Sequence, residues 1–353
     1  MCIRDRVTPA LASLRSGGSL ADRAAALGLP FMELDMEQGG AARAAGMIRL
    51  VRFARALRPD ILQGWMYHGN AAASLTAMAL PGCRVFWSVR QSLGAPETEQ
   101  AGTRRLIRKA VHLRRRPERI FYNSEASARD HEQLGYPRHC RKVIPNGFEL
   151  DRFKPDPAAR KRFREELGLS PDAPLIGMVA RYHPVKDHAG FLKAAAILAG
   201  NRTDVHFVLA GQGVTGENDP LSRQVDSLGL TGRCHLLGER GDVAGITAAL
   251  DLATLTSISE GFPNVVGEAM ACGVPVVSTA AGEAPSILAG IGTVVPCGDS
   301  GKMAAAWQEI LELPADRRAA LGRAGRARIE DRYSIHRMVS NFETVYQAPE
   351  AGG

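Results

Sequence analysis

The chain has 353 residues, of which 45% are hydrophobic, and its formal net charge is +7. This length suggests two domains with ample apolar residues for their cores, and the positive charge suggests an anionic partner. The sequence has no run of about 18 apolar residues and no signal-peptide core, which excludes a membrane-spanning segment and predicts a cytoplasmic protein. The six cysteines are scattered without a C-x-x-C pair, which predicts reduced thiols and no metal site.

Short β-type runs alternate with helical patterns along the chain, which predicts parallel sheets covered by helices. In the first half we expect a helix over 41–57 and strands at 10–14, 31–34, 61–64, 84–89, 119–123 and 142–144. In the second half we expect strands at 175–180, 205–210, 234–237, 252–256, 274–278 and 293–295. Two closing helices are expected at 315–331 and 334–346.

A break between the two halves is predicted at 151–157, where Pro155 and Pro157 interrupt regular structure. We therefore predict one domain over residues 1–156 and a second over 157–333. The remaining segment, 334–353, would form a C-terminal helix that could cross back to the first domain.

Two carboxylates, Glu260 and Glu268, lie eight positions apart across a Gly/Pro/Asn turn between a predicted strand and a predicted helix. Backbone N–H groups at the start of such a helix form an anion site. Glu268, expected on the first turn after Asn264 as the N-cap, could accept hydrogen bonds from vicinal hydroxyls. Together these groups would hold the diphosphate and ribose of a nucleotide. The alternative is that Glu268 only complements the helix dipole.

Arg181 ends a predicted strand, and Lys186 follows five residues later. Two cations at this spacing suit a diphosphate, because arginine can bind phosphate oxygens bidentately while lysine acts as a point charge. The alternative is an exposed loop with solvated charges. Arg240 follows the strand at 234–237, and its loop could border a nucleobase. Taken alone, that loop is better explained as a plain turn between a strand and a helix.

The glycines Gly211, Gly213 and Gly216 form a literal G-x-G-x-x-G after a strand, the pattern of a dinucleotide-binding turn. That pattern requires a helix to begin within the glycines, whereas a proline at position 220 predicts a later start. We therefore favour a flexible loop beside a nucleotide over a dinucleotide site.

These features together resemble glycosyltransferase family 4. The resemblance rests on Glu-x7-Glu at 260–268, on Arg181 with Lys186, on Gly211-x-Gly213 and on Leu-Leu-Gly-Glu-Arg at 236–240. The segments at 65–68, 87–90 and 144–148 also look like that family, so the resemblance covers about residues 7–346. It implies the GT-B architecture, an α/β fold in which two Rossmann-like, doubly wound domains face each other across a cleft.

The resemblance implies sugar transfer with retention of configuration, without a metal or another cofactor. A nucleotide-sugar, most simply a UDP-sugar, would be the donor, and a glycan or lipid-linked molecule would be the acceptor. Arg181 and Lys186 would stabilise the departing diphosphate, Glu268 would hold the ribose, Glu260 would position the sugar, and Arg240 would border the base. The remaining donor-binding residues would be Gly211, Gly213, Gly261, Phe262, Pro263, Asn264 and Val265.

The first half departs from the family pattern in two ways. The family opens with a strand and a Gly-rich loop, whereas this chain opens at what resembles the second strand, and the pair of glycines at 17–18 is a weak substitute. We expect a gap between neighbouring strands there, and a chain less stable and less active than an extended version. The position at which many relatives carry a histidine holds Arg90, and His68 follows a neighbouring strand. Both are candidate acceptor-side residues, although His68 is equally well explained as structural.

The stretch 104–119 holds eight cations in sixteen residues, with apolar positions that could share one helix face. Two interpretations stay open: a peripheral contact with an anionic membrane, and a solvated helix whose apolar side packs on the sheet. Nucleic-acid binding is disfavoured because no aromatic residue interleaves with the charges. The sequence thus predicts a glycosyltransferase of polysaccharide synthesis at the inner membrane face. A nucleotide-sugar epimerase and a non-catalytic, donor-binding remnant are the alternatives.

Overall fold

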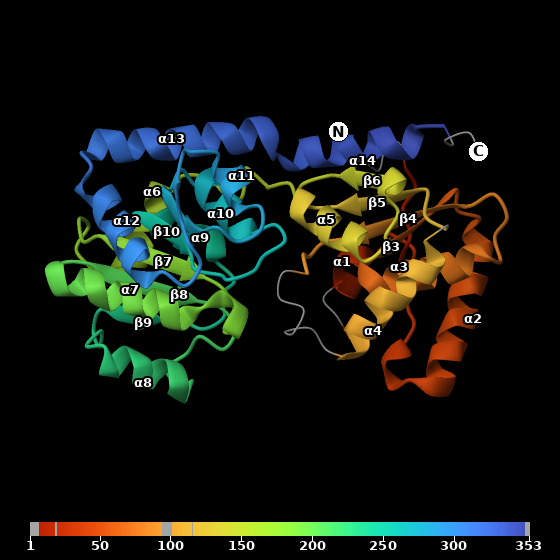
Figure 1. Ribbon diagram of the computed structural model, residues 1–353, viewed down its shortest axis with the longest axis horizontal. Helices are drawn as coiled ribbons and strands as arrows, with labels where there is room; N and C mark the ends of the chain where they lie inside the picture. Colours follow the sequence, from red (N-terminus) through yellow and green to blue (C-terminus); the bar gives the residue numbers. More distant parts are fainter. Residues whose placement is uncertain (1–6, 18–19, 94–100, 115, 350–353) are drawn as a thin grey trace.

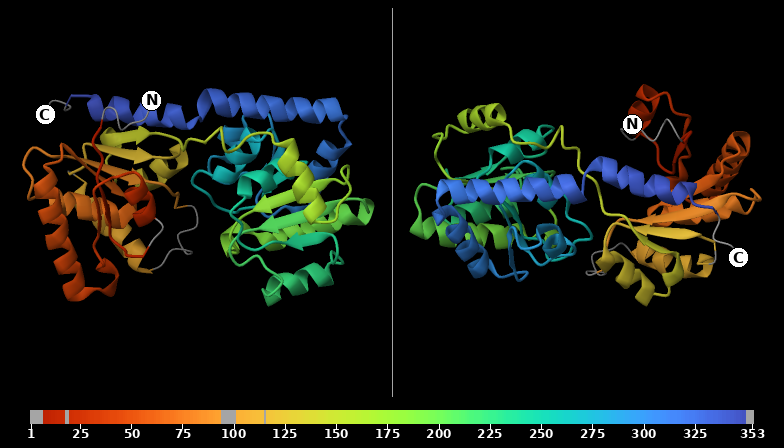
Figure 2. Two further views of the ribbon diagram at one scale, coloured as in Figure 1. Left: turned by 180° about the vertical axis from the view of Figure 1, so that it is seen from behind. Right: turned by 90° about the horizontal axis from the view of Figure 1, so that it is seen from above.

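The computed structural model describes residues 7–17, 20–93, 101–114 and 116–349. The chain forms two α/β halves, and a pair of C-terminal helices runs along both of them (Figures 1 and 2). The strands predicted from the sequence are confirmed in the described part of the chain, each within two residues of its expected ends. No helix among the described residues is long and apolar enough to span a bilayer.

The C-terminal half contains a six-stranded parallel sheet in the order β12-β11-β10-β7-β8-β9. Its strands are β7 (Leu175–Val179), β8 (His206–Ala210), β9 (Cys234–Leu236), β10 (Leu252–Leu255), β11 (Val276–Thr279) and β12 (Thr293–Val295). The chain fills one side of β7 with β8 and β9, then returns to the other side with β10, β11 and β12. This is the predicted doubly wound arrangement, and its switch point lies between β7 and β10. Ligands of such sheets bind outside the carboxyl ends of the strands at this point.

Helices cover both faces of this sheet (Figure 1). They are α6 (Pro157–Glu166), α7 (His188–Asn201), α8 (Asp219–Ser227), α9 (Val243–Ala249), α10 (Asn264–Ala271), α11 (Ala284–Leu288) and α12 (Ser300–Glu312). One core packs α7 and α12 on the sheet through Phe191, Phe207 and Trp307. A second core, with Phe163 and Met270, packs α6 and α10. Strands buried on both faces read as continuous apolar runs, which is why the sequence revealed them.

The N-terminal half contains a four-stranded parallel sheet in chain order, made of β3 (Ile61–Trp65), β4 (Arg84–Val89), β5 (Arg119–Tyr122) and β6 (Arg141–Val143). A separate parallel pair consists of β1 (Leu11–Ser13) and β2 (Phe31–Glu33). Pairing is thus interrupted between the two sheets of the described residues, as expected from the sequence, while the expected effects on stability and activity stay predictions. The helices are α1 (Leu20–Ala26), α2 (Gly40–Leu57), α3 (Met66–Ala77), α4 (Ala101–Ala110) and α5 (Glu125–Gln133).

The chain crosses between the halves twice. It leaves the first half after β6, and α6 then begins at Pro157 with Asp156 as its N-cap, where Oδ1 accepts from the backbone N–H of Ala159 at 2.9 Å. It returns between α13 (Ala315–Arg332), which lies on the C-terminal half, and α14 (Ile335–Gln347), which lies on the N-terminal sheet (Figure 1).

Aromatic packing holds α14 on the N-terminal sheet. The ring centroids of Phe342 and Phe121 are 4.8 Å apart, and those of Tyr346 and Phe86 are 5.8 Å apart. Arg84 Nη1 donates to the backbone carbonyl of Tyr346 at 2.8 Å. The core of this half therefore includes a helix from the far end of the chain.

Candidate functional site

The loops that follow β7, β8 and β9 meet at one edge of the C-terminal sheet and are joined by backbone hydrogen bonds. The N–H of Tyr182 donates to the carbonyl of Gln212 at 2.7 Å, and the N–H of Gly211 donates to that of Gly238 at 2.7 Å. The N–H of Gly238 donates in turn to the carbonyl of Val214 at 2.7 Å. These contacts fix the three loops relative to one another, so side chains on one loop are held in register with the next.

Glycine is required at the first and third positions of the loop after β8. Gly211 has a φ of 148°, and a Cβ atom there would overlap the carbonyl oxygen of Ala180, whereas Gly213 has a φ of 74°. Gly216 has open space around it. Helix α8 begins only at Asp219, after the glycines, with Asn218 as its N-cap. The structural requirement of the dinucleotide-binding pattern is therefore not met.

The loops after β7 and β10 meet across the switch point of the sheet. Lys186 Nζ donates to Glu260 Oε1, and Ser257 Oγ donates to the same oxygen at 2.7 Å. The side chains of Lys186 and Glu260 are 23% and 13% exposed, so the ion pair is largely shielded from water. Thr256 Oγ1 also donates to the carbonyl of Lys186 at 2.8 Å. Two of the residues predicted to be catalytic are thus brought into direct contact.

Arg181 lies on the same loop as Lys186 and is exposed. Within the described residues it has no hydrogen bond or ion pair, so its guanidinium is available to a ligand at this edge. Lys186 belongs to a short turn, Pro184–Lys186, in which His183 Nδ1 accepts from the backbone N–H of Val185 at 3.3 Å. This turn directs the lysine toward Glu260.

Helix α10 starts one residue earlier than the sequence suggested. Pro263 is the N-cap and Asn264 is the first helical residue, so Glu268 lies in the second turn rather than the first. Glu268 is half-buried, and burial raises the pKa of its carboxyl group while Arg152 partly offsets the effect. No side chain of the described residues forms a hydrogen bond with this carboxylate. Of the other residues predicted in this segment, Phe262 and Pro263 are buried, Gly261 and Val265 are half-buried, and Asn264 is exposed.

Arg240 forms ion pairs on two sides. Its guanidinium donates to Glu166 Oε1 at 2.6 Å and to both oxygens of Asp242 at 2.8 Å. These hydrogen bonds raise the pKa of Arg240 and lower that of Asp242. These ion pairs were not predicted from the sequence. A contact between Arg240 and a nucleobase stays a prediction, and it would compete with both carboxylates.

The two acceptor-side candidates have different surroundings. Arg90 Nε donates to Ser88 Oγ at 3.0 Å, and the guanidinium lies over the rings of Trp65 and Phe342 at 5.0 and 5.4 Å. Burial lowers the pKa of Arg90 to about 10. His68 is exposed in the first turn of α3, and partial burial and Arg43 lower its pKa. Arg90 thus has a structural role between β4 and α14, and an acceptor role for either residue stays a prediction.

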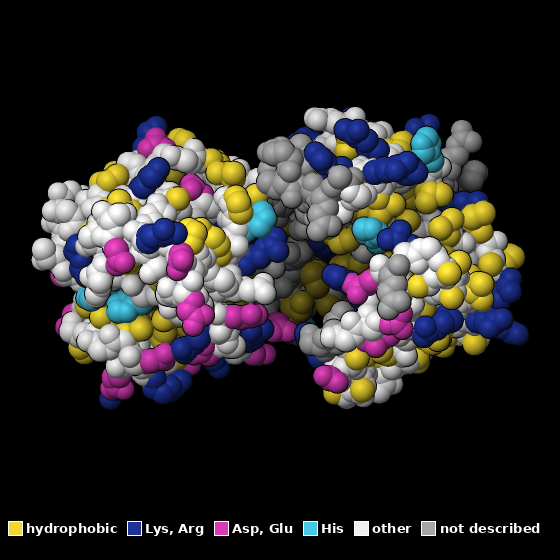
Figure 3. Space-filling model, turned by 90° about the horizontal axis from the view of Figure 1, so that it is seen from below, with side chains coloured by type: hydrophobic (Ala, Val, Ile, Leu, Met, Phe, Trp, Pro, Cys, Tyr) yellow, Lys and Arg dark blue, Asp and Glu magenta, His cyan; other side chains and the backbone are white. Residues whose placement is uncertain are grey.

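Hydrogen bonds between the halves reach the donor-side loops, and the sequence did not predict them. Ser92 Oγ donates to the backbone carbonyl of Glu260 at 2.5 Å. The N–H of Ala126, at the start of α5, donates to Glu283 Oε1 at 3.2 Å. Asn146 Nδ2 donates to Asn264 Oδ1 at 2.8 Å. Seen from below, the molecule is hollowed between the halves (Figure 3). The loop that carries Glu260 therefore lies where the two halves meet.

The described residues contain no group of three or more histidine, cysteine, aspartate or glutamate side chains that could hold a metal ion. The five cysteines among them are free thiols. Transfer without a metal stays a prediction, because the chemistry of the donor site has to be tested directly.

Two family models match the chain. Glycosyltransferase Family 4 matches residues 4–152, and Glycosyl transferases group 1 matches residues 159–328. The first model thus spans the N-terminal half and the second spans most of the C-terminal half. The two models together cover most of the chain, which belongs to glycosyltransferase family 4 and has the GT-B fold that the sequence predicted.

Solved structures show the same arrangement of both halves. HepE (Alr3699) of Anabaena, in complex with UDP and glucose, has a TM-score of 0.84 at 25% identity over 98% of this chain and 93% of that chain. A sucrose-phosphate synthase of Thermosynechococcus elongatus has a TM-score of 0.73 at 18% identity, over 96% of this chain and 98% of that chain, and shares the fold.

Curated relatives match a shorter part of the chain. The D-inositol 3-phosphate glycosyltransferase of Mycolicibacterium paratuberculosis is 34% identical over 215 residues, which is 60% of this chain and 48% of the relative. The protein of the same name from Mycobacterium tuberculosis is 36% identical over 203 residues, which is 56% of this chain and 42% of the relative. The chain spans about half the length of the curated relatives that it matches.

Proposed function

We propose that the protein transfers a sugar from a UDP-sugar to a glycan or lipid-linked acceptor, with retention of configuration, in cell-surface polysaccharide synthesis. The observation that carries the proposal is the contact between Lys186 and Glu260 across the switch point, with the exposed Arg181 on the same loop. The likeness to HepE, whose structure contains UDP and glucose, supports this choice of donor.

The cations would act on the leaving group. As the bond between sugar and diphosphate breaks, negative charge develops on the diphosphate, and preorganised cations stabilise that charge most where water is excluded. Lys186 is held in place by Glu260 before any donor binds, so little reorganisation is needed. Arg181 has its donors free to bind phosphate oxygens bidentately. No metal ion enters this scheme.

Glu260 would position the sugar rather than attack it. Its Oε1 already accepts hydrogen bonds from Lys186 and Ser257, which lowers its availability as a nucleophile. Its remaining oxygen can accept from a sugar hydroxyl. The acceptor hydroxyl would then approach from the same face that the diphosphate leaves. In this scheme Glu268 accepts from the ribose, and the loops of Gly211 and Arg240 border the base.

Calorimetric titration of the protein with UDP and with GDP tests the donor assignment. We expect UDP to bind and the variant with Arg181→Ala and Lys186→Ala to bind at least tenfold more weakly, because two cations leave the diphosphate site. The matched control is Lys193→Ala, an exposed cation on α7 that has no role in the site. Equal affinity of the double variant and the wild type would remove the diphosphate assignment.

Product analysis separates transfer from the alternative activities. With a UDP-sugar and an acceptor, a transferase forms a glycosylated product and UDP, whereas an epimerase converts the donor without an acceptor. A non-catalytic remnant would bind UDP without turnover. Activity retained in the presence of a chelator would support transfer without a metal, and strong inhibition would contradict it. Action in the cytoplasm at the inner membrane face is part of the same proposal.

A further inference from the structure

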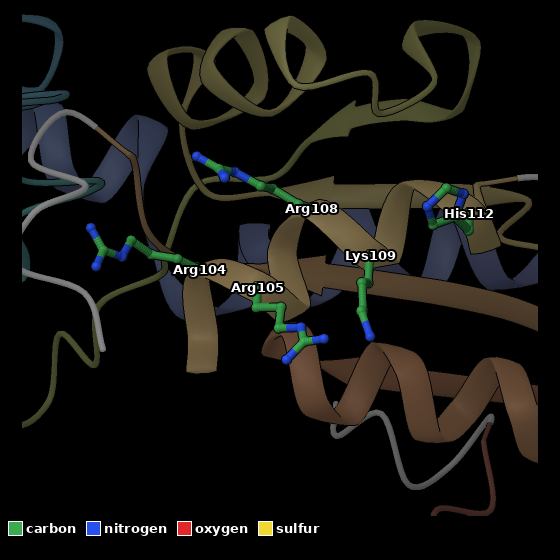
Figure 4. Close-up of a pocket in the computed structure, with 5 residues that line it drawn as sticks. All are labelled: Arg104, Arg105, Arg108, Lys109 and His112. Carbon is green, nitrogen blue, oxygen red and sulfur yellow. The ribbon is translucent and has the colours of Figure 1, made fainter. Parts of the chain in front are cut away.

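Helix α4 carries four basic side chains on its outer face, and His112 follows them in the short turn Val111–Leu113. Arg104, Arg105, Arg108, Lys109 and His112, which we call the basic strip, line one open hollow of about 490 Å³ (Figure 4). All five side chains are exposed. Figure 4 shows them projecting from one helical stretch, with Arg104 at the end nearest the C-terminal half.

The opposite side of the helix is occupied by the protein core. Ile107 and Ala110 are each 2% exposed and pack against the sheet with Trp87 and Ile120. Of the two interpretations that the sequence left open, packing on the sheet is therefore the one found. Insertion of this apolar side into a membrane is excluded, because the side chains already belong to a core. Only the charged face is free to meet a partner.

The charge of the basic strip is not compensated within the described residues. Arg104 and Arg108 are four positions apart, as are Arg105 and Lys109, and like charges at this spacing weaken a helix. The sequence from 101 to 116 contains no aspartate or glutamate, and no ion pair joins the strip to a described carboxylate. By contrast, Arg240 of the C-terminal half has two acidic partners.

The positive charge of the whole chain is also concentrated in its N-terminal half. Residues 1–156 carry 25 lysines and arginines against 15 aspartates and glutamates, whereas residues 157–353 carry 19 against 22. The positive charge of the protein is therefore a property of its N-terminal half. Figure 3 shows basic side chains on that half beside hydrophobic ones, on the face that also shows the hollow between the halves.

We propose that the basic strip docks the protein on a surface of anionic phospholipids. The strip consists of long, flexible, exposed side chains without a buried donor that would fix the shape of one soluble anion. It extends over about 12 Å from residue 104 to 112, given the rise of an α-helix, which suits several headgroups at once. No aromatic residue lies between 101 and 116, which disfavours nucleic acid. The contact is electrostatic and does not require insertion.

Helix α4 lies on the lower side of the N-terminal half in Figure 1, and the hollow between the halves is seen from below (Figure 3). Docking through α4 would therefore bring this hollow close to the membrane. The placement of the hollow near the membrane matters only if the acceptor is lipid-linked, so this part of the inference rests on the proposed function. The docking itself does not depend on sugar transfer and can be measured without donor or acceptor.

The test is co-sedimentation with phosphatidylcholine vesicles, with and without phosphatidylglycerol. We expect binding only to the anionic vesicles, with a steep loss as salt is raised, because screening weakens contacts between exposed charges and headgroups. The strip variant replaces Arg104, Arg105, Arg108 and Lys109 by glutamine. Its affinity should fall roughly a hundred- to thousand-fold, since each cation near the surface contributes about 1 kcal/mol, or about fivefold.

The matched control removes the same number of charges from exposed positions of the C-terminal half, through Arg162→Gln, Lys193→Gln, Arg317→Gln and Arg323→Gln. It should bind anionic vesicles as the wild type does. An equal loss in both variants would mean that net charge alone drives binding and would overturn the assignment to α4. Failure of the wild type to bind anionic vesicles would overturn the proposal itself.

Three further measurements test this interpretation. Circular dichroism melting shows whether the strip variant is folded, and a variant with lysine at the three arginine positions should restore vesicle binding. Inorganic pyrophosphate added to the wild type with vesicles distinguishes the source of the phosphate. Release of the protein by pyrophosphate, beyond the effect of sodium chloride at equal ionic strength, would identify a site for a soluble anion and overturn the membrane assignment.

Discussion

We predict that alanine substitutions at the three glycines of the loop after β8 change the free energy of unfolding by different amounts. The three changes are Gly211→Ala, Gly213→Ala and Gly216→Ala, each of which adds one methyl group to the same loop. At Gly216 there is open space, at Gly213 φ is 74°, and at Gly211 φ is 148° and the added Cβ would overlap the backbone of Ala180. The series therefore separates the effect of the residue type from the effect of the position.

The expected magnitudes follow from these surroundings. Gly216→Ala should stabilise the protein by about 0.5 kcal/mol, because alanine reduces the entropy of the unfolded chain. Gly213→Ala should cost about 1 kcal/mol, since a left-handed conformation costs an alanine about 1–2 kcal/mol. Gly211→Ala should cost about 4 kcal/mol, from about 2 kcal/mol of backbone strain and the loss of about two hydrogen bonds between the loops.

Urea unfolding, monitored through hydrogen exchange of peptides from β7 and β8, measures the stability of the C-terminal half in each variant. Titration with UDP then shows whether the loop must be intact for nucleotide binding, and we expect Gly211→Ala to bind most weakly. Equal stability of the three variants, or a stable Gly211→Ala variant, would refute the claim that backbone crowding requires glycine at this position.

Three further predictions concern the ribose-binding carboxylate, the contacts between the halves and a buried histidine. Glu268→Gln should weaken UDP binding about tenfold, measured by calorimetry, because a neutral amide is a poorer acceptor for ribose hydroxyls. Ser92→Ala together with Glu283→Gln should lower turnover several-fold while UDP affinity is kept, measured by steady-state kinetics, because these side chains join the halves at the loop of Glu260. The fold should lose stability as pH falls below about 6.5, measured by urea unfolding, because burial lowers the pKa of His131 and the unfolded chain binds the proton first.

Each of these predictions has an outcome that contradicts it. Unchanged UDP affinity of Glu268→Gln would argue that the carboxylate only complements the helix. Loss of UDP affinity along with turnover in the Ser92 and Glu283 variant would indicate damage to the donor loop rather than to contact between the halves. For His131, whose Nδ1 donates to the carbonyl of Ser127 at 2.7 Å, a His131→Gln variant should have a shallower pH slope. An identical slope would assign the effect to other buried histidines.

The strands and the doubly wound order could be predicted because they depend on local features. Apolar runs bounded by turn residues mark buried parallel strands, and the Glu260–Glu268 segment showed its strand, loop and helix directly. The start of α10 was wrong by one residue for a non-local reason. The side chain of Asn264, expected to cap the helix, instead accepts from Asn146 of the other half.

Contacts between distant segments could not be predicted in the same way. Arg240 pairs with Glu166, which lies 74 residues away, so neither periodicity nor spacing gives a signal for it. Arg90 is enclosed by Phe342 from the end of the chain, which its place after β4 did not reveal. Ser92 and Glu283 carry no local motif, and only the tertiary structure shows that they reach across the halves.

The return of α14 to the first sheet makes the N-terminal folding unit discontinuous in sequence. Phe148 exchanges backbone hydrogen bonds with Tyr333 and Ile335, so the outgoing and returning segments run side by side. A cut in the linker would leave the first fragment with Phe86 and Phe121 uncovered, and the second with an unaccompanied helix. Two-fragment complementation, or a circular permutant that fuses residues 335–347 ahead of the first half, would keep both units intact.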